Sequence, residues 1–172
     1  MSTFPYPFDP KHRMGLKDYH MTKDFDYFYD LPESLFPAKA PYNRPPMFHF
    51  GYPADLAKVE KWAREHGFTN DMIKAIVGED DVTVEDFQRM VRLATVRFTC
   101  REATKIAGFP VKITYGRRKG AAFWLVSLFT NILPRESQTV PLVVMEISEK
   151  LAGGPPNWYL DATRFYWNWL NI

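Results

Sequence analysis

The residue types that most often carry out chemistry are few in this chain, and their spacing forms no catalytic or metal-binding pattern. The histidines His12, His20, His49 and His66 are scattered, and Cys100 is the single cysteine. Zinc sites need ligands at short, defined spacings, and a serine or cysteine nucleophile is usually marked by a motif around it. The sequence contains neither pattern, so it predicts no catalytic residue, no metal site and no cofactor.

A small basic cluster is the clearest polar feature of the sequence. Between residues 108 and 134 every charged side chain is basic, and these are Lys112, Arg117, Arg118 and Lys119. Such side chains can bind an anion, for example a phosphate, a lipid headgroup or the carboxylates of a protein partner. The competing interpretation is a solvent-exposed turn, because the glycine spacing in "YGRRKG" is not that of a phosphate-binding loop. Four cations are also too few to indicate a dedicated nucleic-acid-binding protein.

The first 53 residues are rich in proline and aromatic residues. They hold nine of the 14 prolines and thirteen of the 28 aromatic residues (5 Trp, 9 Tyr and 14 Phe). The stretch "FPAKAPYNRPPMFHFGYP" (36–53) alone has five of each. Proline lacks a backbone donor and pushes the residue before it toward extended conformations. We therefore expect residues 1–53 to form an extended arm, and residues 36–53 to exclude a helix and make a poor strand.

The aromatic side chains of this arm and of the C-terminal end are the predicted partner-binding residues. Aromatic rings bury a large area at low entropic cost and are enriched at protein interfaces. We expect the following rings to pack on neighbouring subunits: Phe36, Tyr42, Phe48, Phe50, Tyr52, Trp158, Tyr166, Trp167 and Trp169. The competing interpretation is that they pack on their own chain.

Residues 54–172 show the apolar spacing of a compact helical body. The longest helix is marked by a capping Thr83 and by acidic residues in its first turn, and Gly108 and Pro110 end it. A terminal helix capped by Asn157 would place Trp158, Phe165 and Trp169 on one stripe. The predicted helices cover residues 55–68, 70–78, 83–107, 139–154 and about 157–170.

One segment of the body fits two structures. "VKITY" (111–115) alternates like a strand, and "GRRKG" (116–120) has the composition of a turn. The apolar run that follows, residues 121–133, is longer than most strands, which favours a buried helix. The alternative is a short β-hairpin over about 111–127. The predicted fold class is mainly α, with a helical body, an extended N-terminal arm and an aromatic C-terminal helix.

This architecture predicts how the chain is used, since no motif names a reaction. An isolated arm of this composition should be disordered, and extended arms of this kind spread their contacts over large surfaces. We therefore expect a non-catalytic accessory subunit of a large multisubunit assembly, with the arm and the aromatic tail packed on other protein subunits. By analogy of architecture alone, a mitochondrial respiratory-chain or ATP synthase complex in the inner membrane is a natural setting.

Two other functions are alternatives. A ribonucleoprotein (ribosomal) subunit would contact RNA through Arg117, Arg118 and Lys119, although RNA-penetrating arms are basic and this one is electrically neutral. A small self-contained enzyme or ligand-binding protein is the other alternative. The N-terminal residues show no secretory signal, and the longest apolar run is too short to span a bilayer, which leaves a peripheral lipid contact. The expected location is mitochondrial, with the cytoplasm as the alternative, and not secreted.

Overall fold

The computed structural model describes residues 7–9, 15–37, 44–78, 82–133 and 138–167. Two short 3₁₀ segments, Leu16–Thr22 and Glu33–Leu35, lie before the first strand of the fold. The strands and α-helices, in chain order, are β1 (Phe48–Pro53), α1 (Leu56–Glu65), α2 (Asn70–Val77), α3 (Val84–Ala107), β2 (Lys112–Arg118), β3 (Ala121–Thr130), α4 (Leu142–Leu151) and β4 (Asn157–Asp161).

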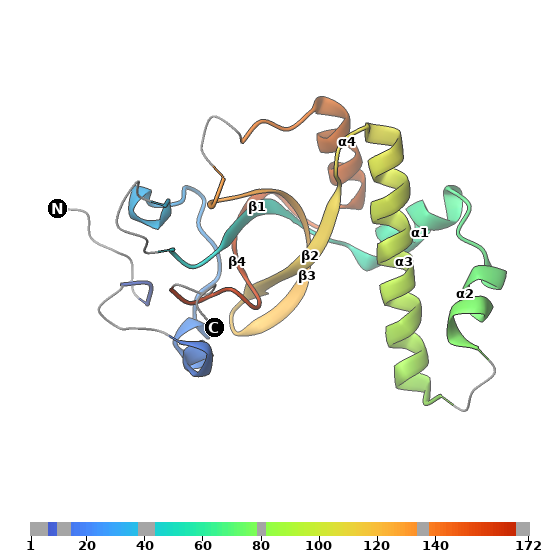
Figure 1. The fold of residues 1–172 in the computed structure, drawn as a ribbon, viewed down its shortest axis with the longest axis horizontal. Coiled ribbons are helices and arrows are strands. Elements are labelled where there is room, and N and C mark those ends of the chain that lie inside the picture. The colour runs from blue at the N-terminus through green and yellow to red at the C-terminus, as the bar shows by residue number, and fades with distance from the viewer. Residues whose placement is uncertain (1–6, 10–14, 38–43, 79–81, 134–137, 168–172) are drawn as a thin grey trace.

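The four strands form a closed antiparallel barrel in the order β1-β3-β2-β4. Helices α1, α2 and α3 lie at one end of the molecule, and the N-terminal segments lie at the other (Figure 1). The prediction of a mainly α fold is therefore wrong. Closing the barrel gives every strand two neighbours, so short strands can satisfy their backbone donors and acceptors without a large sheet.

Strand β1 comes from the end of the predicted proline-aromatic arm. The stretch was expected to make a poor strand, but its prolines lie before the strand or at its last position and do not interrupt it. Pro45 and Pro46 lie before the strand and Pro53 is its last residue. A register shift occurs between Phe50 and Gly51. A Cβ at Gly51 would lie 2.1 Å from the carbonyl oxygen of Val126, so only glycine fits this approach of two strands.

The segment after β2 is a strand, so the preference for a helix over residues 121–133 is wrong and the β-hairpin is present. Residues 112–118 of β2 pair with residues 121–127 of β3. Lys119 and Gly120 form the turn with φ values of 47° and 75°. Strand β3 is long because it pairs with β2 along its first part and continues to β1, where His49 faces Thr130. Its length therefore reflects two partners in a curved barrel and not helical structure.

The four predicted helices before the C-terminal end are present. Asp55, Thr69 and Thr83 cap α1, α2 and α3 through side-chain hydrogen bonds to backbone N–H groups, and Gly108 ends α3 in the left-handed conformation. The C-terminal half of α3 is packed on two sides. Val96 and Ala103 belong to the main core beside the barrel, and Ala94 and Phe98 to a smaller core against Phe68 and Ile73.

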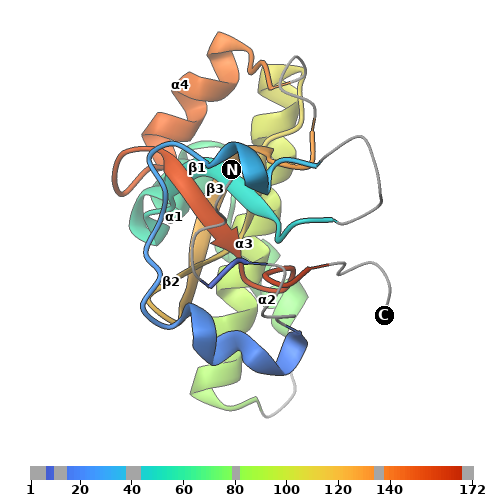
Figure 2. The same ribbon diagram turned by 90° about the vertical axis from the view of Figure 1, so that its left-hand side faces the viewer.

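The predicted C-terminal helix, residues 157–170, is absent from the described part of the chain. Residues 157–161 are β4, and all five are buried. Phe28 adds one antiparallel bridge to Trp158, with N···O distances of 3.0 and 2.9 Å. The N-terminal segment runs beside β4 (Figure 2), and its residues share a core with Trp158 and Leu160. The three middle residues of β4, 158–160, are all apolar and buried, which explains why this sequence resembled a helix with several apolar faces.

Candidate functional site

The aromatic residues predicted to bind partners lie within the chain's own core wherever the structure describes them. Phe48 is fully buried, Tyr52, Trp158 and Tyr166 are buried, and Phe36, Phe50 and Trp167 are partly buried. Tyr42 and Trp169 lie outside the described residues. A second apolar core joins most of these rings to Phe8, Leu31 and Leu35 from the N-terminal segments.

Individual contacts show how these rings attach the arm to the barrel. The rings of Phe50 and Phe129 stack at 5.0 Å, and Phe36 meets Trp158 edge-on at 5.9 Å. The indole Nε1 of Trp167 donates a hydrogen bond to the carbonyl of Phe8 over 3.0 Å. A partner would have to compete with these contacts, so the described rings offer little free surface.

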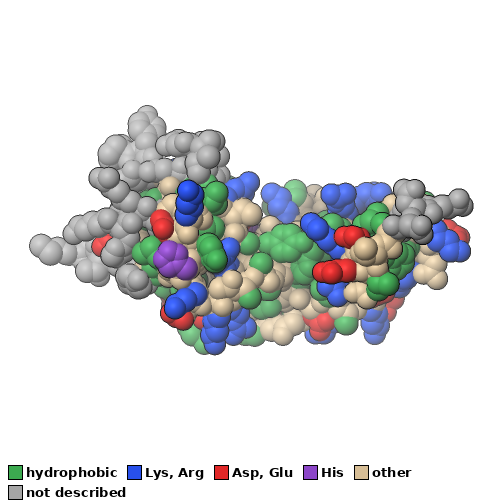
Figure 3. Space-filling model, turned by 90° about the horizontal axis from the view of Figure 1, so that it is seen from below, with side chains coloured by type: hydrophobic (Ala, Val, Ile, Leu, Met, Phe, Trp, Pro, Cys, Tyr) green, Lys and Arg blue, Asp and Glu red, His purple; other side chains and the backbone are tan. Residues whose placement is uncertain are grey.

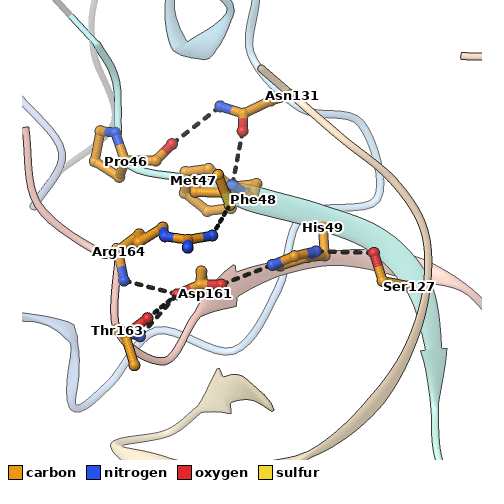
Figure 4. Close-up of polar contacts among 9 residues, drawn as sticks. All are labelled: Pro46, Met47, Phe48, His49, Ser127, Asn131, Asp161, Thr163 and Arg164. Atoms are coloured by element: carbon orange, nitrogen blue, oxygen red, sulfur yellow. Dashed lines mark hydrogen bonds and ion pairs between the residues drawn. The ribbon is translucent and has the colours of Figure 1, made fainter. Parts of the chain in front are cut away.

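Asn131 makes a polar connection beside the aromatic cluster. Its side-chain oxygen accepts a hydrogen bond from the backbone N–H of Phe48 at 2.8 Å. Its Nδ2 donates to the carbonyls of Leu35 and Pro46 at 2.6 and 3.0 Å. The side chain is fully buried, and Figure 4 shows it above the start of β1. Asn131, the residue that follows β3, thereby holds two places of the N-terminal region in position, at Leu35 and at Pro46.

The basic cluster is largely engaged by the chain itself. The guanidinium of Arg117 lies 4.8 Å from the Phe165 ring centroid and donates to the carbonyl of Ala162. Arg118 and Lys119 both pair with Asp26. Lys112 is exposed at the opposite end of β2. The structure therefore brings Arg117, Arg118 and Lys119 together against N- and C-terminal residues and leaves Lys112 apart.

The ion pairs at Asp26 shift two pKa values in the direction that stabilises the charges. Desolvation opposes ionisation of Asp26, but the hydrogen bonds and charges of Arg118 and Lys119 outweigh it and lower its pKa. The hydrogen bond to Asp26 raises the pKa of Arg118. These side chains are partly exposed, and the pairs attach the N-terminal segment to the hairpin turn.

A buried polar network that sequence patterns did not indicate crosses the barrel. Nδ1 of His49 lies 2.8 Å from Ser127 Oγ, and Nε2 of His49 lies 2.8 Å from Asp161 Oδ2 (Figure 4). Oδ1 of Asp161 accepts hydrogen bonds from the backbone N–H groups of Thr163 and Arg164 and from the Thr163 hydroxyl. The three side chains come from β1, β3 and β4, so no local spacing links them.

This network strongly stabilises the ionised form of Asp161. Burial opposes the ionised form of Asp161, yet the hydrogen bond and charge of His49 and the two backbone donors hold the pKa of this carboxyl at about 2, below its ordinary 3.8. A His49 ring that donates from Nε2 to the carboxylate can accept from the Ser127 hydroxyl at Nδ1. The network thus ties β4 to β1 and β1 to β3.

Chemically, a hydroxyl, an imidazole and a carboxylate in this order are the residue types of a serine-hydrolase triad. The two imidazole nitrogens are exchanged, however: Nδ1 of His49 faces Ser127 and Nε2 faces Asp161, whereas in the chymotrypsin-type triad Nε2 faces the serine. The surroundings differ from those of a reactive site. His49 is only 6% exposed, and Ser127 lies within β3, paired with both Gly51 and Lys112. Neither of the cavities described in this structure is lined by the three residues. The network therefore supports the barrel from within, by linking β1 to β3 and to β4.

An apolar groove at the far end of the molecule is the other candidate site. Helices α2 and α3 enclose a groove of about 620 Å³ that is open to solvent. Met72 and Ile76 of α2 line it and are 41% and 47% exposed. From α3 it is lined by Met90, Leu93, Arg97 and Arg101. Over this end, on the right in Figure 3, hydrophobic side chains reach the surface between charged ones.

Within the described residues, no group of three or more His, Cys, Asp or Glu side chains could hold a metal ion. No helix within the same residues has both the length and the apolar character to cross a membrane. Cys100 is partly buried, and this burial raises the pKa of its thiol.

Comparison with known proteins does not assign the chain to a family. No family model, no curated protein and no solved structure matches this sequence.

Proposed function

We propose that this chain is a non-catalytic interaction subunit that binds another protein of its assembly through the groove between α2 and α3. The observation that carries this proposal is the exposure of large apolar side chains in one concave place. Soluble proteins rarely expose such side chains together unless they bind a partner. Two of the residues that line the groove, Met72 and Met90, are methionines, whose flexible thioethers adapt to an incoming surface.

The position of the groove supports a role separate from the barrel. At the barrel end, the described rings of the arm and of β4 contact one another. At the opposite end, the N-terminal half of α3 exposes Val84 and Phe87 next to the groove. The proposal therefore keeps the accessory-subunit hypothesis but moves the partner surface from the aromatic arm to the helical end. The mitochondrial setting stays a prediction, and RNA binding through Arg117, Arg118 and Lys119 has less support because they contact their own chain.

Photo-crosslinking in the native host tests the proposal. The full chain carries a photoreactive amino acid at position 72 in the groove or, as a control, at position 88 on the exposed opposite side of α3. We expect one protein to be captured from position 72 and not from position 88. Met90→Glu should abolish this capture, whereas Gln88→Glu should preserve it. Capture that is equal at both positions, or unchanged by Met90→Glu, overturns the proposal.

A hydrolase is the second candidate function, and the hydrogen bonds from Ser127 through His49 to Asp161 are the observation that favours it. A general base within hydrogen-bond reach of a hydroxyl is the arrangement that activates a serine. A fluorophosphonate probe tests it, because such probes label activated serines. We expect no labelling of the folded protein. Labelling that Ser127→Ala removes would make the chain an enzyme and replace the first proposal.

A further inference from the structure

Resting on the proposed function, we infer that the partner segment is an amphipathic helix with acidic side chains at one end of its apolar stripe. A groove between two helices is a common receptor for a third helix, whose apolar residues enter at spacings of three and four. The chemical identity of the occupant follows from the order of side chains along the groove.

The α3 wall changes character along its length. Met90, Leu93, Arg97 and Arg101 follow one another at spacings of three, four and four residues, so they lie in one row on the helix surface. This row is about 16 Å long at 1.5 Å per residue. Its first half is apolar and faces the apolar residues of α2, and its second half is basic. A complementary helix of three to four turns would carry apolar residues at one end and carboxylates at the other.

The two arginines leave positive charge unbalanced at this end. Arg97 is exposed, and within the described residues no hydrogen bond or ion pair is found for it. Arg101 lies over the Phe98 ring and pairs with Glu102, which also binds Lys105. Two cations thus share one carboxylate, and the groove lining itself contains no acidic residue. Carboxylates of a partner would supply the missing charge and could form bidentate pairs with guanidinium groups.

Charge and shape argue against two other occupants. A second copy of this chain that docked groove to groove would set Arg97 and Arg101 against either their own counterparts or the apolar half of the row. Neither arrangement supplies carboxylates, and the first also places like charges together. An anionic membrane could satisfy the arginines. However, a bilayer is flat, whereas the apolar residues surround a hollow that a protruding row of side chains fills better.

Designed peptides test the inference with the full-length protein. Three fluorescent peptides of about 18 residues, long enough to form a helix, share one leucine stripe. They carry Glu, Lys or Gln beside the last turns of that stripe. In fluorescence anisotropy at low salt, we expect the Glu peptide to bind at least about tenfold more tightly than the Lys peptide, with the Gln peptide between them. Added salt should narrow this difference.

Three variants test whether the peptides bind in the groove. Arg97→Glu should weaken the Glu peptide about tenfold and strengthen the Lys peptide, because it reverses the charge at the contact. Arg92→Glu makes the same change on another exposed face of α3 and should alter either affinity by less than about twofold. Met90→Glu should weaken all three peptides, while circular dichroism confirms that it is folded.

The outcomes separate this inference from the proposed function. If all peptides bind equally and Met90→Glu abolishes binding, the groove is a helix receptor but the acidic partner is wrong. If no peptide binds, the inference is overturned, and the photo-crosslinking experiment alone decides the proposed function. Binding to vesicles of anionic phospholipid without peptide binding would identify a membrane surface instead. A dimer in sedimentation that Met90→Glu dissociates would identify a second copy.

Discussion

The two ends of the molecule use large apolar side chains in different ways. At the barrel end, Phe8, Phe48 and Trp158 are buried in one aromatic core that joins N-terminal, central and C-terminal residues. At the helical end, Met72, Ile76 and Phe87 are between 41% and 47% exposed, and they are supported by a small core of five buried residues. Similar side chains thus stabilise the fold at one end and present a surface at the other.

This difference shows why composition was a poor guide to the partner surface. The region with the highest density of rings is the region where rings have the most partners within the chain. The interaction candidate lies where helices are amphipathic and, among the described residues, their apolar faces line an open groove. Four substitutions compare the two ends, beginning with the largest expected loss of stability.

Removing a ring from the barrel end should have the largest effect. Phe48 is fully buried and its ring centroid lies 5.1 Å from that of Phe8 and 5.6 Å from that of Phe28. Phe48→Ala should lower the free energy of unfolding by about 3–5 kcal/mol, because it removes buried area and leaves a cavity. Urea titration followed by tryptophan fluorescence measures the loss. If Phe48→Ala does not fold, the milder Phe48→Leu still reports the site, and a loss below about 0.5 kcal/mol would contradict the aromatic core.

The buried network should make the barrel end sensitive to acid. The pKa of Asp161 falls from 3.8 to about 2 on folding, so its stabilisation is complete above about pH 4 and is lost as the pH falls toward 2. The contribution is on the order of 2 kcal/mol. Asp161→Asn should remove this part of the pH dependence, measured by urea unfolding between pH 2 and pH 5. Asp71→Asn, which changes an exposed carboxylate of α2, should retain it.

The ion pairs that attach the N-terminal segment to the hairpin turn should contribute little. Asp26→Asn removes the partner of Arg118 and Lys119, all of which are partly exposed. We expect a loss below about 1 kcal/mol in dilute buffer that disappears at about 0.5 M salt. Urea unfolding at two salt concentrations measures it. A loss that persists in high salt would show that Asp26 supports packing in addition to charge pairing.

Removing a ring from the helical end should have the smallest effect on stability. Phe87 is 42% exposed at the N-terminal half of α3. Phe87→Ala should cost no more than about 0.5 kcal/mol, because the ring is only partly buried within the chain and alanine has the higher helix propensity. Its unfolding curve should nearly coincide with that of the wild type, in contrast to Phe48→Ala. A loss comparable to that of Phe48→Ala would mean that the helical end is packed as fully as the barrel.

Local signals in the sequence were sufficient for the helices. Thr83 and Gly108 set the bounds of α3, and similar capping residues begin α1 and α2, because capping depends on atoms within one helical turn. The turn of the β2–β3 hairpin was recognisable in part, since the predicted turn, residues 116–120, contains Lys119 and Gly120 but begins within β2. These features depend on neighbours in the sequence, so they could be predicted before any tertiary contact was known.

Tertiary structure alone decided the barrel and both candidate sites. Strands β1 and β4 pair across more than 100 residues, and His49 meets Asp161 across 112. No local pattern records such a pairing, and a strand that is buried on both faces lacks the alternation that would identify it. Likewise, the sequence determined that Met90, Leu93, Arg97 and Arg101 share a helix face. Only packing decided that this face lines an open groove among the described residues. Burial is a property of the whole chain, because it depends on which distant segments pack against a residue.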